Sequence, residues 1–125
     1  MAGEAILIID DNLLNLELIS FLLTSKGYNV YTVSNAKEAL EMLKSLLPRL
    51  ILMDIQLPGM DGLELTMQLK ADPKFKSIPI IAITAYAMKA DKDRAFAAGC
   101  DGYIAKPINT RSLPDIIEEY LHPRT

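Results

Sequence analysis

The chain carries a short apolar run, Leu50-Ile51-Leu52-Met53, that ends directly in the acid Asp54. Residues 5–9 and 78–83 form two more runs of the same kind, and each also ends in a polar residue. Unbroken apolar runs of this length are typical of central strands in a parallel sheet, because such strands are buried on both faces. They predict a sheet whose strands carry polar groups at their carboxyl ends.

Amphipathic stretches separate these runs. Leu14, Leu18, Phe21 and Leu22 follow helical spacing, as do apolar residues within 36–43 and 113–120. Further helices are expected from about 61, with Asp61 as the cap, to 70 and from about 88 to 98. Further strands are expected at 30–33 and 102–104. Strands that alternate with helices predict an α/β fold with a mostly parallel sheet covered on both faces, in one domain that spans residues 1–125.

The composition excludes several classes of protein. Of 125 residues, 50% are apolar and 23% charged, which suits one folded domain and argues against disorder. Thirteen basic and sixteen acidic residues give a net charge of −3 without a basic cluster, which argues against nucleic-acid binding. A single cysteine excludes a disulfide framework and suits a reducing compartment. No apolar stretch approaches the roughly 20 residues of a membrane span, and the N-terminus lacks a signal-peptide pattern, so we expect a cytoplasmic protein with no membrane partner.

Chemically active side chains gather at the predicted strand ends. Asp10 and Asp11 follow the first strand, Asp54 and Thr84 follow the third and fourth, and Lys106 follows the fifth. Each acid alone could serve as a helix cap or a turn residue. Because open α/β sheets bind ligands at the carboxyl ends of their strands, however, we expect the acids to converge. Three converging carboxylates would repel one another and would suit a hard cation such as Mg²⁺.

This arrangement indicates phosphoryl chemistry. A carboxylate can act as a nucleophile and form an aspartyl-phosphate. Phosphoryl transfer then requires mainly positioning and charge neutralisation. Mg²⁺, Lys106 and the Thr84 hydroxyl could each hold one phosphoryl oxygen.

Four segments together resemble the receiver domain of bacterial response regulators, the signalling domain of two-component and phosphorelay systems. The resemblance covers essentially the whole chain. It implies a doubly wound (βα)5 fold of the flavodoxin-like type, with a five-stranded parallel sheet of order 2-1-3-4-5. The segments are Ile8-Ile9-Asp10-Asp11-Asn12, Leu52-Met53-Asp54-Ile55-Gln56-Leu57-Pro58-Gly59-Met60-Asp61-Gly62, Ile83-Thr84-Ala85 and Gly102-Tyr103-Ile104-Ala105-Lys106-Pro107.

The resemblance also implies a role for each acid. Asp54 would accept the phosphoryl group. Asp11 and Asp54 would bind Mg²⁺ directly, together with the main-chain carbonyl of Gln56. Asp10 would act through a metal-bound water.

The remaining signature residues would bind phosphate and transmit its presence. Thr84 and Lys106 would hold the phosphoryl group, and Tyr103 would turn inward together with Thr84. The Lys106–Pro107 bond is typically cis in this family. A downstream protein would then bind the face formed by the fourth helix, the fifth strand and the fifth helix. Candidate contact residues on or beside that fourth helix are Ala87, Lys89, Lys92 and Phe96.

The implied function is a phospho-acceptor switch. A sensor histidine kinase or a histidine phosphotransfer protein would supply the phosphoryl group from a phosphohistidine. The chain would not be an enzyme beyond self-phosphorylation from phosphodonors and autodephosphorylation. Gln56 and Tyr86 would flank the attacking water, and because the Tyr86 ring is bulky we expect a long-lived phosphoryl group. A stand-alone regulator and a receiver from a hybrid histidine kinase both remain open.

Three other readings compete with the switch. A flavodoxin-like FMN carrier would need a phosphate loop rich in Ser, Thr and Gly after the first strand, where Asp10 and Asp11 stand instead. An aspartyl-phosphatase would need a second acid near its nucleophile, but residue 56 is Gln, and a cap domain for which no length is left. A scaffold without chemistry would leave the strand-end acids unexplained.

The other notable residues receive structural interpretations. Cys100 is expected to be buried as a small hydrophobic residue. His122, near the end of the chain, is not expected to bind a ligand. The lysines of the helices and loops are expected to be solvated, including Lys70.

Overall fold

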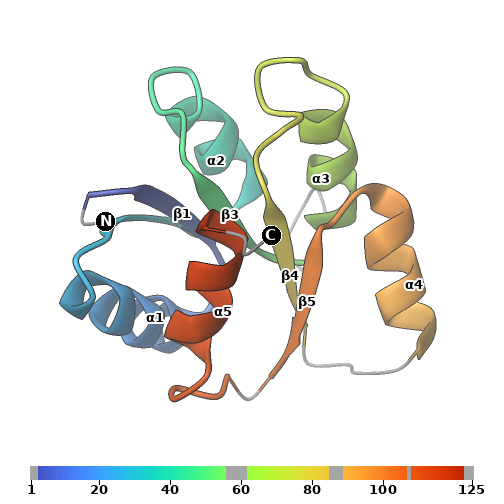
Figure 1. The fold of residues 1–125 in the computed structure, drawn as a ribbon. Helices are drawn as coiled ribbons and strands as arrows, with labels where there is room; N and C mark the ends of the chain where they lie inside the picture. The colour runs from blue at the N-terminus through green and yellow to red at the C-terminus, as the bar shows by residue number, and fades with distance from the viewer. Residues whose placement is uncertain (1–2, 56–61, 85–88, 107, 123–125) are drawn as a thin grey trace.

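The computed structural model describes residues 3–55, 62–84, 89–106 and 108–122, and it forms three layers with a parallel sheet in the middle (Figure 1). The strand order is β2-β1-β3-β4-β5, and every neighbouring pair is parallel. This confirms the predicted fold class and strand order. The strands are β1 (Ala5–Ile9), β2 (Asn29–Val33), β3 (Leu50–Asp54), β4 (Ile80–Thr84) and β5 (Gly102–Ala105).

Five helices cover the two faces of the sheet. Helices α1 and α5 pack on one face, and α2, α3 and α4 pack on the other (Figure 1). Their bounds are α1 (Leu13–Ser25), α2 (Ala36–Met42), α3 (Gly62–Lys70), α4 (Lys89–Ala98) and α5 (Leu113–Leu121). The helix boundaries lie within about three residues of the predicted ranges, including α2, for which apolar residues within 36–43 were expected. Asp61, the predicted cap of α3, lies outside the described residues.

Two hydrophobic clusters form the core, one on each face of the sheet. Ile6 and Ile8 point toward α1 and α5, whereas Leu7 and Ile9 point toward α2 and α3. This alternation follows from the two-residue period of a strand. The prediction that the central strands are buried on both faces is confirmed, because every residue of β3 and β4 is buried.

Local side chains define where the helices begin. The Asn35 side chain caps α2 by accepting the Glu38 N–H at 2.8 Å, and Glu38 in turn accepts the backbone N–H and the hydroxyl of Ser34. These two hydrogen bonds from Ser34 lower the pKa of Glu38. Asn12 caps α1 in the same way, and Pro114 stands in the first turn of α5, where its missing N–H costs little.

The apolar row predicted on α1 exists but does not face the core. Leu14, Leu18 and Phe21 are 76%, 40% and 72% exposed. Leu16, Ile19 and Leu23 make the buried face instead. Because α1 is apolar on more than one side, periodicity alone could not tell which side packs against the sheet.

One of the structural interpretations from the sequence is wrong. Lys70 is not solvated, because its side chain is only 18% exposed and its ammonium donates to Asp101 and to two backbone carbonyls. The prediction that His122 binds no ligand is not tested, but the residue has a partner within the protein, because its Nε2 lies 2.5 Å from Oε2 of the buried Glu4. Cys100 is buried as expected, and burial raises the pKa of its thiol.

Within the described ranges, no helix combines the length and the apolar character that a membrane crossing requires.

Candidate metal and phosphoryl site

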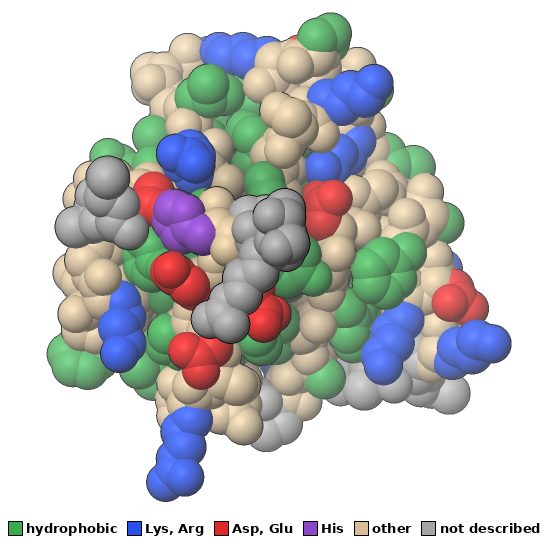
Figure 2. All heavy atoms as spheres, viewed as in Figure 1, with side chains coloured by type: hydrophobic (Ala, Val, Ile, Leu, Met, Phe, Trp, Pro, Cys, Tyr) green, Lys and Arg blue, Asp and Glu red, His purple; other side chains and the backbone are tan. Residues whose placement is uncertain are grey.

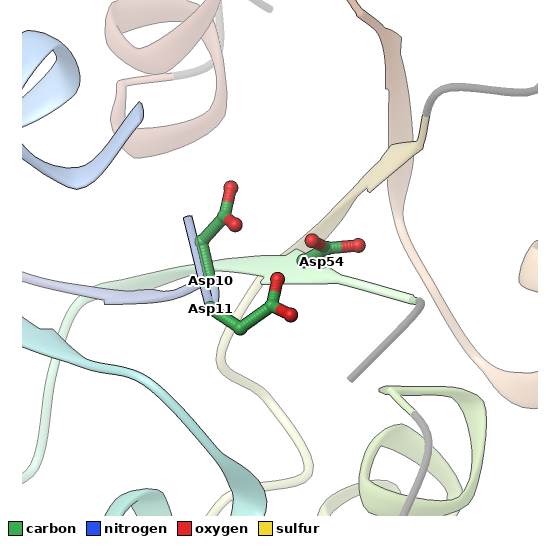
Figure 3. A group of neighbouring side chains, drawn as sticks. All are labelled: Asp10, Asp11 and Asp54. Atoms are coloured by element: carbon green, nitrogen blue, oxygen red, sulfur yellow. The ribbon is translucent and has the colours of Figure 1, made fainter. Parts of the chain in front are cut away.

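Three carboxylates converge at the carboxyl edge of the sheet (Figure 3). Asp10 and Asp11 follow β1, and Asp54 is the last residue of the adjacent strand β3. Each side chain offers an oxygen, and these oxygens all lie within 4.8 Å of one another. Asp10 and Asp54 are 0% and 2% exposed, while Asp11 is exposed. The predicted convergence of the acids is therefore present.

The first turn of α1 stabilises the buried Asp10. Its Oδ1 accepts the backbone N–H of Asn12 at 2.9 Å, and its Oδ2 accepts the side-chain amide of Asn15 at 3.4 Å. The backbone N–H of Asp10 also donates to the Val33 carbonyl at 3.2 Å. A buried carboxylate without such donors would be costly, so these contacts hold its place in the site.

Lys106 supplies the positive charge. Its backbone N–H donates to the Thr84 carbonyl at 2.7 Å, which ties the residue after β5 to the end of β4. Its ammonium lies 3.2 Å from Asp54 Oδ2 and 3.7 Å from Asp10 Oδ2. One lysine against three carboxylates leaves this cluster with excess negative charge.

The end of β3 is held by a close approach of α3. The backbone N–H of Gly62 donates to the Ile55 carbonyl at 3.2 Å, and a Cβ at position 62 would collide with the main chain of Asp54 and Ile55. Only glycine therefore allows α3 to begin so close to Asp54. Thr84 is fully buried at the end of the next strand.

The donor set fits a hard divalent cation. All three side chains offer carboxylate oxygens, the ligands that Mg²⁺ takes together with retained waters. A divalent cation would offset the charge that Lys106 leaves. Asp54, one of the two buried acids, lies within reach of Lys106, so it can act as a nucleophile toward a phosphoryl group whose oxygens the lysine helps to neutralise.

The structure places most of the predicted site residues. It brings Asp10, Asp11, Asp54 and Lys106 together, with Thr84 at the end of the strand beside β3. Tyr103 lies on β5, where its half-buried ring has the ammonium of Lys92 5.4 Å from its centroid. The remaining residues named for this site lie outside the described part of the chain: Gln56, Tyr86 and Pro107.

Sequence reasoning missed two contributors to this site. Gly62 entered the sequence analysis only as the last residue of the segment around Asp54, and no role was assigned to Asn15 within the first predicted helix. The Asn15 amide could have been suspected, because residue 15 stands one helical turn after the cap Asn12 and so returns to the end of β1. The packing of Gly62 against Asp54 depends on tertiary structure and has no local signal.

Comparison with known proteins connects this geometry to a family. Residues 6–118 match the family model of the response regulator receiver domain. The polar-differentiation response regulator DivK of Brucella anthropi is 43% identical over 118 residues, which cover 94% of this chain and 96% of that protein.

Solved structures show the same architecture. The receiver domain of sensor histidine kinase PA1611 from Pseudomonas aeruginosa superposes with a TM-score of 0.87 at 34% identity, covering 96% of this chain and 98% of that one, and it has a magnesium ion coordinated in its active-site cleft. The phosphorylated cyanobacterial phytochrome response regulator RcpA superposes with a TM-score of 0.83 at 30% identity, covering 99% and 98%. With its strand-end acids and this match over most of its length, the chain belongs to the response regulator receiver domains, the phospho-accepting signalling domains of two-component systems.

Proposed function

We propose that Asp54 is the phospho-acceptor and that the whole chain, residues 1–125, is one receiver domain. The observation that carries the proposal is the convergence of Asp10, Asp11 and Asp54 beside Lys106. An Asp54 oxygen attacks the phosphorus of a phosphohistidine and forms a P–O bond. The P–N bond breaks, and its electron pair returns to the imidazole nitrogen.

The charge of the site supports a magnesium-dependent reaction. Asp11 and Asp54 would bind Mg²⁺ directly with the main-chain carbonyl of Gln56, and Asp10 would bind it through a water. When bound, the ion neutralises charge on the carboxylates and on the transferred group. Lys106 and the Thr84 hydroxyl hold the phosphoryl oxygens of the product.

A small phosphodonor tests this assignment. Acetyl phosphate with Mg²⁺ should add one phosphoryl group, detected as an increase in intact mass, and Asp54→Asn should block it because the amide is not a nucleophile. The exposed Asp93 on α4 offers a matched control, so Asp93→Asn should be phosphorylated like the wild type. A phosphorylated Asp54→Asn protein would show that another residue is the acceptor.

The exposed row on α1 supports a protein donor. Leu14, Leu18 and Phe21 lie on a helix that begins beside Asp11, so they continue from the site onto the surface. Residues 13–25 contain no Lys or Arg, so the face is apolar rather than cationic. We propose that this row docks the sensor histidine kinase or the histidine phosphotransfer protein that carries the phosphohistidine.

Phosphorylation rates with a protein donor and with acetyl phosphate distinguish an effect on docking from an effect on the chemical step. Leu14→Ala and Phe21→Ala should slow phosphorylation by the phosphorylated cognate kinase about tenfold or more, because exposed anchors of an interface cost about 1–3 kcal/mol each. Both variants should react normally with acetyl phosphate. Leu47 is 57% exposed on a loop just before β3, so Leu47→Ala is the matched control. Equal transfer rates for all three variants would exclude α1 as the docking surface.

The face of α4, β5 and α5 supports an output surface. Phe96 is 49% exposed on α4, and Lys92 on the same helix covers the Tyr103 ring. Figure 2 shows blue side chains over α4 and red ones over α5, so this side of the molecule offers both charges around apolar groups. We propose that phosphorylation moves Thr84 and Tyr103 and thereby changes how a downstream protein binds here.

Chemical shifts test the relay from the site to this face. Phosphorylation should shift amide signals of α4 and β5 as well as those near Asp54. Tyr103→Ala should keep the shifts near Asp54 and lose those of α4. Changes confined to the neighbourhood of Asp54 in the wild type would contradict the relay.

The lifetime of the phosphoryl group remains a prediction, because Gln56 and Tyr86 lie outside the described residues. We propose self-phosphorylation from small donors and a slow autodephosphorylation in the cytoplasm, with Tyr86 shielding the phosphorus from water. Tyr86→Ala should therefore accelerate the decay. A decay that is unchanged or slower would remove the shielding argument.

A further inference from the structure

Asp10 is the most enclosed acid of the site, and its two oxygens have different partners. Oδ1 accepts the backbone N–H of Asn12 at 2.9 Å. Oδ2 faces two side-chain donors, the Asn15 amide at 3.4 Å and the Lys106 ammonium at 3.7 Å. Asp10 is 0% exposed, so its partners come from the protein and from whatever occupies the site.

Lys106 is shared between two acids. Its ammonium is nearer to Asp54, at 3.2 Å, than to Asp10. A phosphoryl group on Asp54 would draw the lysine further in that direction, because it adds negative charge there. Asn15 is then the donor that remains on Oδ2 of Asp10.

The position of Asn15 is itself well defined. Its backbone N–H donates to the capping oxygen of Asn12 at 3.2 Å, and the next residue, Leu16, is buried against the sheet. The amide therefore projects from a fixed first turn of α1 rather than from a mobile loop. An orienting group of this kind acts by pre-organising the carboxylate that it contacts.

We propose that Asn15 is a positioning residue for magnesium binding, which it supports by holding Oδ2 of Asp10 in the orientation that accepts a metal-bound water. The inference rests on the proposed function, because it assigns to Asp10 the water-mediated role given above. Asn15 does not contact the phosphoryl group, so its contribution is to metal affinity and not to the transfer step.

Magnesium titration measures this contribution directly. Isothermal calorimetry with Mg²⁺ should show that Asn15→Ala raises the dissociation constant about five- to tenfold, the lower end of what groups that orient metal-site residues contribute, because the 3.4 Å contact is long. Asn15→Leu keeps the size of the side chain without the donor and should behave like Asn15→Ala. Asn15→Gln retains an amide and should recover part of the affinity.

Phosphorylation kinetics separate metal affinity from chemistry. With acetyl phosphate, the half-saturating Mg²⁺ concentration of Asn15→Ala should rise by the same factor as the dissociation constant. The rate at saturating Mg²⁺ should stay within about twofold of the wild type, because the nucleophile and Lys106 are unchanged.

A control variant distinguishes positioning from helix stability. Asn35→Ala removes the side-chain cap of α2, a helix whose cap makes no contact with Asp10 or Asn15 among the hydrogen bonds of the described residues. It should lower the melting temperature while leaving magnesium affinity within about twofold of the wild type.

Three results would overturn the inference. The first is wild-type magnesium affinity in both Asn15→Ala and Asn15→Leu. The second is a lowered plateau rate with an unchanged magnesium dependence. The third is an equal loss of affinity in the helix-cap control Asn35→Ala. A wild-type protein that needs no Mg²⁺ would instead refute the proposed function.

Discussion

Two lysine–aspartate clusters lie at opposite ends of the same sheet, and they differ in their balance of charge. At the amino end, the Lys70 ammonium donates to Asp101 Oδ2 at 2.8 Å and to the carbonyls of Ile78 and Lys76 at 2.8 and 3.2 Å. Asp101 Oδ2 also accepts the backbone N–H of Ile80 at 2.9 Å. In this cluster one positive charge faces one negative charge, and the ammonium and the carboxylate have hydrogen-bond partners within the protein.

The carboxyl end has the opposite character. The Lys106 ammonium lies near both Asp54 and Asp10, at longer distances than the 2.8 Å between Lys70 and Asp101. Asp11 adds a third carboxylate. The excess of negative charge costs stability unless a cation offsets it. The comparison teaches that a cluster with balanced charges indicates a structural role, whereas an unbalanced cluster at the other end of the same sheet indicates a binding site.

The largest expected effect concerns the balanced cluster. Lys70→Met keeps the length of the side chain but leaves Asp101 and two carbonyls without their shared donor, so the free energy of unfolding should fall by about 2 kcal/mol. Urea denaturation measures it. Lys44→Met, which breaks the exposed Lys44–Glu41 pair, should change the stability by less than about 0.5 kcal/mol. If both variants lose the same amount of stability, the Lys70–Asp101 cluster contributes no more than an ordinary surface ion pair.

The second-largest expected effect is the stabilisation of the protein by magnesium bound at the carboxyl end of the sheet. A tenfold excess of Mg²⁺ over its dissociation constant contributes about 1.4 kcal/mol to the free energy of unfolding through linkage. The gain should appear in the wild type and in Lys70→Met, and it should be much reduced in Asp11→Asn. A gain that persists undiminished in Asp11→Asn would show that the stabilising cation binds elsewhere.

Replacement of Asp by Asn should change the free energy of unfolding in opposite directions at the two ends of the sheet. Without Mg²⁺, Asp11→Asn should raise the free energy of unfolding by about 1 kcal/mol, because it removes one of three repelling carboxylates. Asp101→Asn should lower it by about 1 kcal/mol, because it weakens the bonds to Lys70 and to the Ile80 N–H. Equal signs in the two variants would contradict the comparison.

The smallest effect concerns a hydrogen bond that joins Tyr28, the residue before β2, to Glu118 of α5. Burial and the hydrogen bond that Tyr28 donates to Glu118 at 2.9 Å raise the pKa of Tyr28 to about 12. The folded-state pKa exceeds the ordinary value near 10, so the stability from this group is complete below about pH 10 and is lost as the pH rises toward 12. Tyrosinate absorbance should show a component that titrates near pH 12 and that is absent in Tyr28→Phe. An unchanged titration curve in that variant would assign the raised pKa to another tyrosine.

The fold and most of the site could be predicted from the sequence because their signals are local. Buried parallel strands have a distinctive composition, and a residue at the end of such a strand must lie at the carboxyl edge of the sheet, as Asp10, Asp54 and Thr84 do. The family resemblance added the strand order and the individual roles.

The errors arose where a signal depended on tertiary contacts. The side of α1 that packs inward could not be chosen, because Leu16 and Ile19 are as apolar as the exposed Leu14 and Phe21. Lys70 carries no sequence mark that separates it from solvated lysines, since its partners are carbonyls of a loop and an acid 31 residues away. The Asn15–Asp10 contact was missed because it joins a helix to the strand end before it.

The two separate hydrophobic clusters have an evolutionary consequence. Helix α1, with its exposed row, packs on one cluster, and α4, with Phe96, packs on the other side of the sheet. Substitutions on the surface of one helix therefore leave the packing of the other unchanged, and their effects should be nearly additive. If α1 binds the kinase and α4 the downstream target, as proposed above, one copy after a gene duplication could keep its kinase and acquire a new target, or keep its target and change its kinase. Such a layout lets signalling circuits be rewired one connection at a time.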